Sequence, residues 1–181
     1  THNAAESQEW LEALRFFSAN EQKFCLYELP DREVLPYDYF SPHPDITSER
    51  LNTLYHLQSQ SCGVCVVTLP TLMTRLCPRD YINRDSLILK VGQQLETSAL
   101  KNQLDDAGYQ HRDTVFEHGE YAVRGSLLDI YPMGSDTPYR IDLFDDEISS
   151  LRTFDPENQR SHEKIEHIAI LPAAEVCLDK Q

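Results

Sequence analysis

The sequence predicts two consecutive mixed α/β parts, the first built on an incomplete doubly wound parallel sheet and the second on a twisted antiparallel sheet. Helical and strand-like segments alternate over residues 1–85, which is typical of parallel sheets whose strands are joined by helices. From about Asp85 onward, strand-like segments follow one another across short turns, which favours antiparallel pairing. We therefore expect one domain at residues 1–85 and a second at residues 86–172.

The first domain is predicted to open on an amphipathic helix at residues 4–19, because apolar side chains recur there at helical spacing between charged ones. The segments that follow are a strand at 24–27, a Pro- and Tyr-rich loop at 35–44, a helix from its capping Asp45 to Leu57, a strand at 63–67 and a short helix at 70–76. A doubly wound unit normally begins with a central strand. Since this chain begins with a helix, we expect the first strand to be missing and the chain to be a piece of a longer protein.

The second domain is predicted to consist of strands covered by one helix. The helix spans residues 95–107 and ends at Gly108, a residue type that commonly terminates helices. A tight turn is expected at Asp145, Asp146 and Glu147. Strands are predicted at 87–91, 121–131, 139–144, 148–154 and 165–171.

The composition favours a folded acidic protein and argues against several protein classes. Hydrophobic residues make up 40% of the 181 residues, which is enough for a buried core. The 16 basic residues stand against 30 acidic ones, and the formal charge of −14 would repel a nucleic-acid duplex. The sequence contains neither a signal peptide nor an apolar stretch of membrane length. Its 5 widely spaced cysteines favour reduced thiols, so we expect a cytoplasmic protein.

The patterns that usually carry chemistry do not form a complete site in this sequence. Cys62 and Cys65 have the spacing of a metal knuckle, but a structural zinc needs four ligands and no second pair is suitably placed, so packing in a strand is favoured. His118 is expected in a turn, and the acidic pairs are explained by helix ends and turns. The phosphate loop of nucleotide-binding enzymes is absent. We predict no catalytic residue, no metal site and no cofactor.

The segment Tyr139–Phe144 is the most informative part of the sequence. Alternation sends Tyr139, Ile141 and Leu143 to the core face of a strand, and it sends Arg140, Asp142 and Phe144 to the other face. Arg124, in the preceding strand, can lie alongside. Two guanidiniums and a phenyl ring on one face have the composition of a protein-binding hot spot. The alternative is that both arginines pair with nearby acids such as Asp129 and Asp142, while Phe144 packs under a loop.

Several long motifs in this sequence resemble one protein family. Segments at 120–132, 140–152 and 154–156 resemble a region shared by UvrB and the transcription-repair coupling factor (Mfd). Segments at 35–45, 49–57 and 71–78 resemble the coupling factor specifically. The resemblance covers nearly all of the chain from about residue 33 onward.

This resemblance implies the remnant of a helicase-like α/β domain that carries an inserted UvrB-like α+β domain, which docks on UvrA. Residues 173–181 resemble the segment that returns to the first domain. The family's contact positions for UvrA are matched here by Arg124, Arg140 and Phe144. The long DNA-gripping hairpin of UvrB is replaced by a short loop at 37–45, and the ATP-binding loop would precede residue 1.

The expected function is therefore that of a non-catalytic adaptor that mimics UvrB and recruits UvrA to a stalled RNA polymerase. RNA polymerase and DNA would be reached through other domains of the full-length protein, with no direct nucleic-acid binding by this chain. Two alternatives remain open. One is a fragment of an ATP-dependent UvrB-type DNA helicase. The other is a domain that inhibits the translocase motor of its own full-length protein, with the C-terminal regulatory region as its partner.

Overall fold

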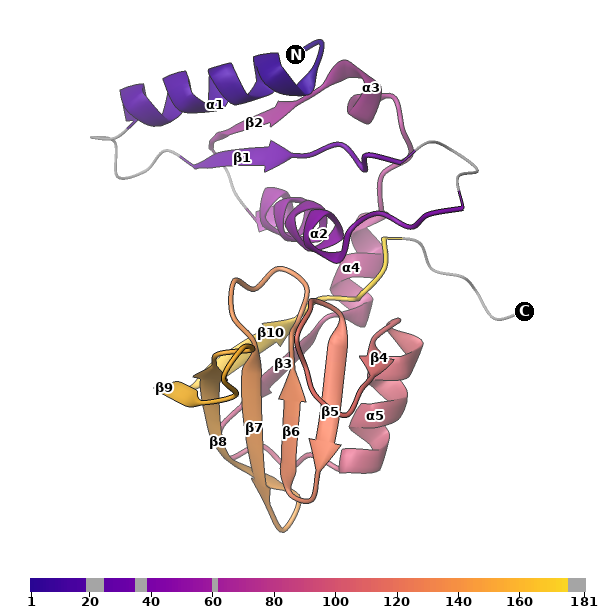
Figure 1. Ribbon diagram of the computed structural model, residues 1–181, viewed down its shortest axis with the longest axis vertical. Coiled ribbons are helices and arrows are strands. Elements are labelled where there is room, and N and C mark those ends of the chain that lie inside the picture. Colours follow the sequence, from indigo (N-terminus) through magenta and orange to yellow (C-terminus); the bar gives the residue numbers. More distant parts are fainter. Residues whose placement is uncertain (19–24, 35–38, 60–61, 176–181) are drawn as a thin grey trace.

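The computed structural model describes residues 1–18, 25–34, 39–59 and 62–175 (Figure 1). The upper part in Figure 1 contains α1 (Ala4–Ser18), β1 (Leu26–Leu29), α2 (Pro44–Ser59), β2 (Val64–Val67) and α3 (Leu69–Leu72). The helix α4 (Arg79–Asp85) leads to the lower part. The lower part contains β3 (Leu87–Lys90), α5 (Thr97–Asp106), β4 (Gln110–His111), β5 (Glu120–Arg124), β6 (Leu127–Ile130), β7 (Tyr139–Phe144), β8 (Glu147–Phe154), β9 (Ser161–Ile165) and β10 (His167–Ile170).

In the upper part, β1 and β2 form a parallel pair between α1 and α2 (Figure 1). The pair begins where the backbone N–H of Val64 donates a hydrogen bond of 2.9 Å to the carbonyl oxygen of Cys25. A Cβ at Gly63 would lie 2.5 Å from that same oxygen. Only glycine allows the two chains to approach so closely. The Cys-Gly-Val-Cys stretch therefore serves strand pairing.

The lower part is built on a main sheet of 6 strands in the order β4-β5-β6-β7-β8-β9. Its strands pair antiparallel from β5 to β9, while β4 runs parallel to β5. β3 and β10 form a separate antiparallel pair. We call the face of the main sheet that packs against α5 and the β3–β10 pair the inner face, and the opposite face the outer face.

The inner face of the main sheet forms the largest hydrophobic core. The strands β5 to β8 contribute apolar side chains to it from one face, as the period of two along a strand requires. The helix α5 contributes Leu100 and Leu104 from one side. The buried members are Leu89, Leu100, Leu104, Tyr109, Tyr121, Leu128, Ile130, Ile141, Leu143, Ile148, Leu151, Ile168 and Ile170. The residues between them on the same strands are thereby directed to the outer face.

The segment after β10 joins the lower part to the upper part. The hydroxyl of Tyr109 donates to the carbonyl oxygen of Leu171 at 2.6 Å and accepts from the backbone N–H of Met133 at 3.2 Å. Burial raises the pKa of Tyr109, so its hydroxyl stays a donor. The backbone N–H of Ala173 donates to the carbonyl oxygen of Ala107 at 2.8 Å. These bonds fix the path of the chain back to the upper part.

A buried ion cluster completes this junction. Arg50 of α2 is fully buried, and its Nε donates to Oε1 of Glu175. Its Nη2 donates to Oε2 of the same carboxylate at 3.3 Å, and its Nη1 donates to the carbonyl oxygen of Pro30. Arg32 contacts Oε2 of Glu175 at 2.5 Å from a more exposed position. Glu175 thus ties the return segment to α2, because a buried charge requires a partner.

The predicted mixed α/β fold with antiparallel sheets is confirmed. Helix α2 begins at Pro44, so Asp45 lies in its first turn and is not its cap. The described residues of the upper part form a parallel layer of only two strands, so the larger doubly wound sheet stays a prediction. Parts of the predicted strand at 24–27, the loop at 35–44 and the return segment at 173–181, including Cys177, lie outside the described residues.

Several predicted elements of the chain are wrong in extent or number. The single strand expected at 121–131 is a hairpin of β5 and β6, because Gly125, with φ of 62°, turns the chain. The short helix expected at 70–76 ends at Leu72, and α4 and β4 were not predicted. The strand expected at 165–171 is divided between β9 and β10. The polar composition of β9 conceals it from a hydrophobicity pattern.

We expect Arg50→Ala to lower the free energy of unfolding by about 3 kcal/mol, because it removes the fully buried partner of Glu175. Arg32→Ala is the matched control, because Arg32 is partly exposed on the same carboxylate, and it should cost about 1 kcal/mol or less. Urea unfolding of both variants measures the difference. Equal losses would show that the buried pair does not hold the junction.

Candidate functional site

The outer face of the main sheet carries a row of charged residues at matching positions. The register pairs Ala122 with Asp129, Asp129 with Arg140, Arg140 with Arg152, and Arg152 with Lys164. Residues directly opposite one another in adjacent strands point to the same side of a sheet. The row therefore has one carboxylate, on β6, followed by three cations on β7, β8 and β9.

Asp129 is the centre of the site, and it is 1% exposed. Its Oδ1 accepts a hydrogen bond of 2.7 Å from Nε of Arg140. Its Oδ2 accepts from Nη2 of Arg140 at 2.9 Å and from Nη2 of Arg124 at 2.5 Å. A buried carboxylate needs such compensation, and guanidinium groups supply it with matching geometry. Because two cations share one anion, the cluster keeps a net positive charge.

Arg140 is committed to the fold by contacts on several sides. Besides its two bonds to Asp129, its Nη1 donates to the carbonyl oxygen of Gln159 at 3.2 Å and to Oγ of Ser161 at 3.1 Å. Its guanidinium carbon lies 4.9 Å from the centre of the Phe154 ring, in cation–π geometry. The hydrogen bonds to Asp129 raise the pKa of Arg140, although burial opposes this effect. Arg140 therefore remains charged and held in place.

Arg124 has the opposite balance of contacts. It ends β5 and donates to Asp129 through Nη2, while 47% of its side chain is exposed. Gly125 follows it, and a Cβ added at Gly125 would meet no atom within 4 Å. Most of the N–H groups of the Arg124 guanidinium are thus available to a second carboxylate. Arg124 is oriented by the sheet and still accessible to a partner.

Phe144 lies at the tip of the β7–β8 hairpin and is 71% exposed. The turn consists of Asp145 and Asp146, with φ values of 48° and 60°. Positive φ at both central positions matches the twist of two antiparallel strands and fixes the direction of the hairpin. The predicted tight turn is therefore present, although Glu147 already belongs to β8. Exposure of an apolar ring to water is unfavourable, and the fixed hairpin holds this ring where a partner can bury it.

The structure places the three predicted site residues on the outer face, with Arg140 near the start of β7 and Phe144 at its end. Arg124 and Arg140 share Asp129, and the backbone N–H of Leu143 donates to the carbonyl oxygen of Ser126 at 2.9 Å, which places Phe144 beside the β5–β6 turn. We call Arg124, Asp129, Arg140 and Phe144 the hairpin surface. The alternative reading is half correct: the arginines do pair with Asp129, but Phe144 is not covered by a loop of the described residues.

Arg152 is not among the predicted site residues, although it belongs to the same face. Its Nε is buried and has no hydrogen-bond partner among the described residues. Oγ of Ser150, on the same strand, is also buried and unpaired there. A strand pattern alone assigns Arg152 to a face. Only the register of β7 with β8 places it directly opposite Arg140.

The other candidate group, His118, is engaged in contacts that stabilise the fold. Nδ1 of His118 contacts Oδ1 of Asp45 at 2.8 Å, and its Nε2 contacts the carbonyl oxygen of Ser135 at 2.8 Å, so this ring links α2 to the lower part. Within the described ranges, no group of three or more His, Cys, Asp or Glu side chains is arranged to hold a metal ion. No helix of these residues has the length and apolarity of a membrane span.

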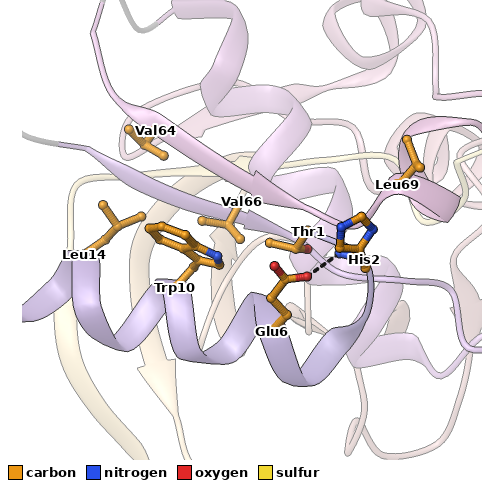
Figure 2. A pocket seen from close by; sticks show the side chains of 8 residues that line it. All are labelled: Thr1, His2, Glu6, Trp10, Leu14, Val64, Val66 and Leu69. Carbon is orange, nitrogen blue, oxygen red and sulfur yellow. Dashed lines mark hydrogen bonds between the residues drawn. The ribbon is translucent and has the colours of Figure 1, made fainter.

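A hollow between α1 and β2 lies in the upper part and is distinct from the hairpin surface. Figure 2 shows that Trp10 and Leu14 of α1 face Val64 and Val66 of β2 across it. At its other end, Oε2 of Glu6 accepts a hydrogen bond of 2.6 Å from the backbone N–H of His2. This bond lowers the pKa of Glu6. The lining is mainly apolar, and its polar groups are engaged within the chain: Thr1 bonds to Ser7 and to the carbonyl oxygen of Val67, and Glu6 bonds to His2.

The chain is similar to one domain family and to several transcription-repair-coupling factors. Residues 87–175 match the family described as the UvrB interaction domain. The chain is 56% identical over 152 residues to the transcription-repair-coupling factor of Escherichia coli, an alignment that covers 84% of this chain and 13% of that protein. It is 49% identical over 160 residues to the transcription-repair-coupling factor of Haemophilus influenzae, covering 88% of this chain and 14% of the relative.

A more distant relative extends the match to nearly the whole chain. The transcription-repair-coupling factor of Bacillus subtilis is 30% identical over 178 residues, which is 98% of this chain and 15% of the relative. The chain thus spans between 13% and 15% of the length of these three relatives. The matched domain family begins at Leu87, the first residue of β3.

We expect Asp129→Asn to lower the free energy of unfolding by about 3 kcal/mol, because it removes the buried anion that holds two guanidiniums. Asp142→Asn is the matched control on the same face and should change stability by less than about 0.5 kcal/mol. Thermal or urea unfolding measures both. A neutral effect of Asp129→Asn would mean that this carboxylate does not organise the site.

Proposed function

Because this chain belongs to the family of transcription-repair-coupling factors, we propose that it is a non-catalytic adaptor that binds UvrA through the hairpin surface. The observation that carries the proposal is the exposure of Phe144 on the same sheet face as two arginines that a buried carboxylate holds in place. Hot spots of protein interfaces combine an aromatic anchor with arginine in this way.

Arg124 would form the direct polar contact with UvrA. It is 47% exposed, and its guanidinium has N–H groups left after the single bond to Asp129. A carboxylate of the partner can bind these groups while Asp129 stays in place. The side chain is already oriented before binding, so less conformational entropy is lost on association.

Phe144 would fill an apolar recess of UvrA. With 71% of the residue exposed, burying the ring in a complex removes a large apolar area from water. The rigid β7–β8 turn presents the ring without a prior rearrangement. The exposed ring contributes little to the stability of the free domain. Its apolar area would contribute to the binding free energy once a partner buries it.

Arg140 would act mainly by positioning Asp129 and, through it, Arg124. Its contacts to Asp129, Gln159 and Ser161 use most of its N–H groups within the chain.

The positive charge of the hairpin surface contrasts with the formal charge of −14 on the whole chain, which favours an acidic patch on the partner. Local charge complementarity of this kind accelerates association and fixes the register of the partners.

In this proposal the chain mimics UvrB, so that UvrA meets the same type of surface on both proteins. The upper part would be a remnant of a helicase-like domain that supports the lower part. ATP hydrolysis, DNA translocation and contact with RNA polymerase would belong to other domains of the much longer full-length protein, which acts in the bacterial cytoplasm. The UvrB interaction domain matched at residues 87–175 is not a motor domain.

We expect Arg124→Ala and Phe144→Ala each to weaken UvrA binding by about 2 kcal/mol, or roughly 30-fold in Kd. Both side chains are exposed, so the free domain should keep its stability. Isothermal titration calorimetry with purified UvrA measures the affinity. Arg140→Ala should weaken binding similarly but also destabilise the fold, since Asp129 then loses its two-point partner.

The matched controls lie on other surfaces of the molecule. Phe17→Ala removes an aromatic ring of α1 that is 79% exposed, and Arg84→Ala removes an arginine of α4. Both should bind UvrA as the unmodified chain does. Unchanged affinity in the Arg124→Ala and Phe144→Ala variants, with folding intact, would refute the hairpin surface as the binding site.

A further inference from the structure

We propose that Arg152, with Lys164 beside it, forms a second anion-binding point on the outer face and takes a second acidic side chain of UvrA. This inference rests on the proposed function, because it names a further contact of the same partner. It starts from a polar group of the free domain whose hydrogen-bonding capacity is not used.

Arg152 has a buried donor without an acceptor in the described part of the chain. Its Nε has essentially no contact with solvent and makes no hydrogen bond there. Oγ of Ser150, two residues away on β8, shares this condition. Buried polar groups in folded proteins are almost always paired, so an unpaired one calls for a physical explanation.

Neither Asp129 nor Asp142, the two acidic residues of β6 and β7 on the outer face, stands directly opposite Arg152. Asp129 receives three hydrogen bonds from Arg124 and Arg140, and it lies two strands away from β8, or about 10 Å. Asp142 stands opposite Ser150, outside the row that contains Arg152. Arg152 forms no ion pair in the described part of the chain, whereas Arg140 on the adjacent strand pairs with Asp129.

The row Arg140, Arg152 and Lys164 places three cations side by side on β7, β8 and β9. Like charges directly opposite one another in a sheet repel. Asp129 relieves this repulsion at the β7 end only. An anion bound over β8 and β9 would relieve the rest and give the partly buried Arg152 guanidinium a counter-charge.

Two observations favour a carboxylate of UvrA over a nucleic-acid phosphate. The row is continuous with the hairpin surface through Arg140, so one partner can cover both. The chain also has a formal charge of −14, which opposes a polyanion while tolerating a single carboxylate on a protein surface. Arg124 on β5 and Arg152 on β8 are three strand spacings apart. Since the two arginines are also offset by two residues along the strands, the partner should present two acidic groups separated by about 16 Å.

The test compares the affinity of the chain for UvrA, by calorimetry at low and moderate salt, before and after Arg152→Gln. We expect about a 10-fold weaker Kd at low salt and a smaller effect at moderate salt, because salt screens a charge contact. Lys164→Gln should weaken binding about 3-fold. Arg84→Gln on α4 is the matched control for the loss of one positive charge and should leave the affinity unchanged.

Two further measurements separate the contact from a structural effect. Since Nε of Arg152 is unpaired in the free domain, Arg152→Gln should unfold at the same temperature as the unmodified chain or higher. A fluorescent DNA duplex titrated with the chain should show no Arg152-dependent binding. Such binding would overturn the proposal in favour of a phosphate site.

The outcomes distinguish this inference from the proposed function. If Arg152→Gln and Lys164→Gln bind UvrA normally while Arg124→Ala does not, the second contact is wrong and the adaptor function stands. If Arg152→Gln lowers both the unfolding temperature and the affinity, Arg152 is a structural residue and the inference fails. If the unmodified chain does not bind UvrA, both proposals fail together.

Discussion

The outer face of the main sheet depends on one buried carboxylate. Asp129 lies in the second strand of the β5–β9 meander, where an apolar side chain would be the usual occupant, and its charge has to be compensated. Arg140 supplies two hydrogen bonds and Arg124 a third. Because this compensation uses two cations, the same interaction that stabilises the sheet also leaves an excess of positive charge on its surface. Structure and proposed function thus have a common electrostatic origin.

The packing of the inner face and the two hairpin turns fix the positions of the residues in this charge cluster. Apolar residues on alternate positions pack against α5 and the β3–β10 pair, so a slip of one residue in register would bury the charges and expose the core. The turn at Asp145 and Asp146 fixes Phe144, and the turn at Gly125 fixes Arg124. The positions of the site residues therefore follow from the packing on the opposite face. The ion cluster around Glu175 holds this sheet against the upper part.

Local patterns were sufficient to predict which residues share a face but not how the strands pair. Alternation in Tyr139–Phe144 separates Arg140 and Phe144 from the core residues, as observed. The division of residues 120–130 into β5 and β6 depends on a two-residue turn within a mainly apolar stretch, which periodicity does not reveal. The polar strand β9 is identified only by its pairing with β8. The proximity of Arg152 to Arg140 is likewise a property of the register, which is set by contacts distant in sequence.

The most direct test of the account is hydrogen–deuterium exchange of the chain with and without UvrA. Binding at the hairpin surface should slow exchange in peptides that contain the β5–β6 turn and the β7–β8 turn, because a bound partner suppresses local opening there. Peptides from α1 and α2 should exchange at an unchanged rate. Protection confined to the upper part, or no protection at either turn in a saturated complex, would contradict the claim that this surface receives UvrA.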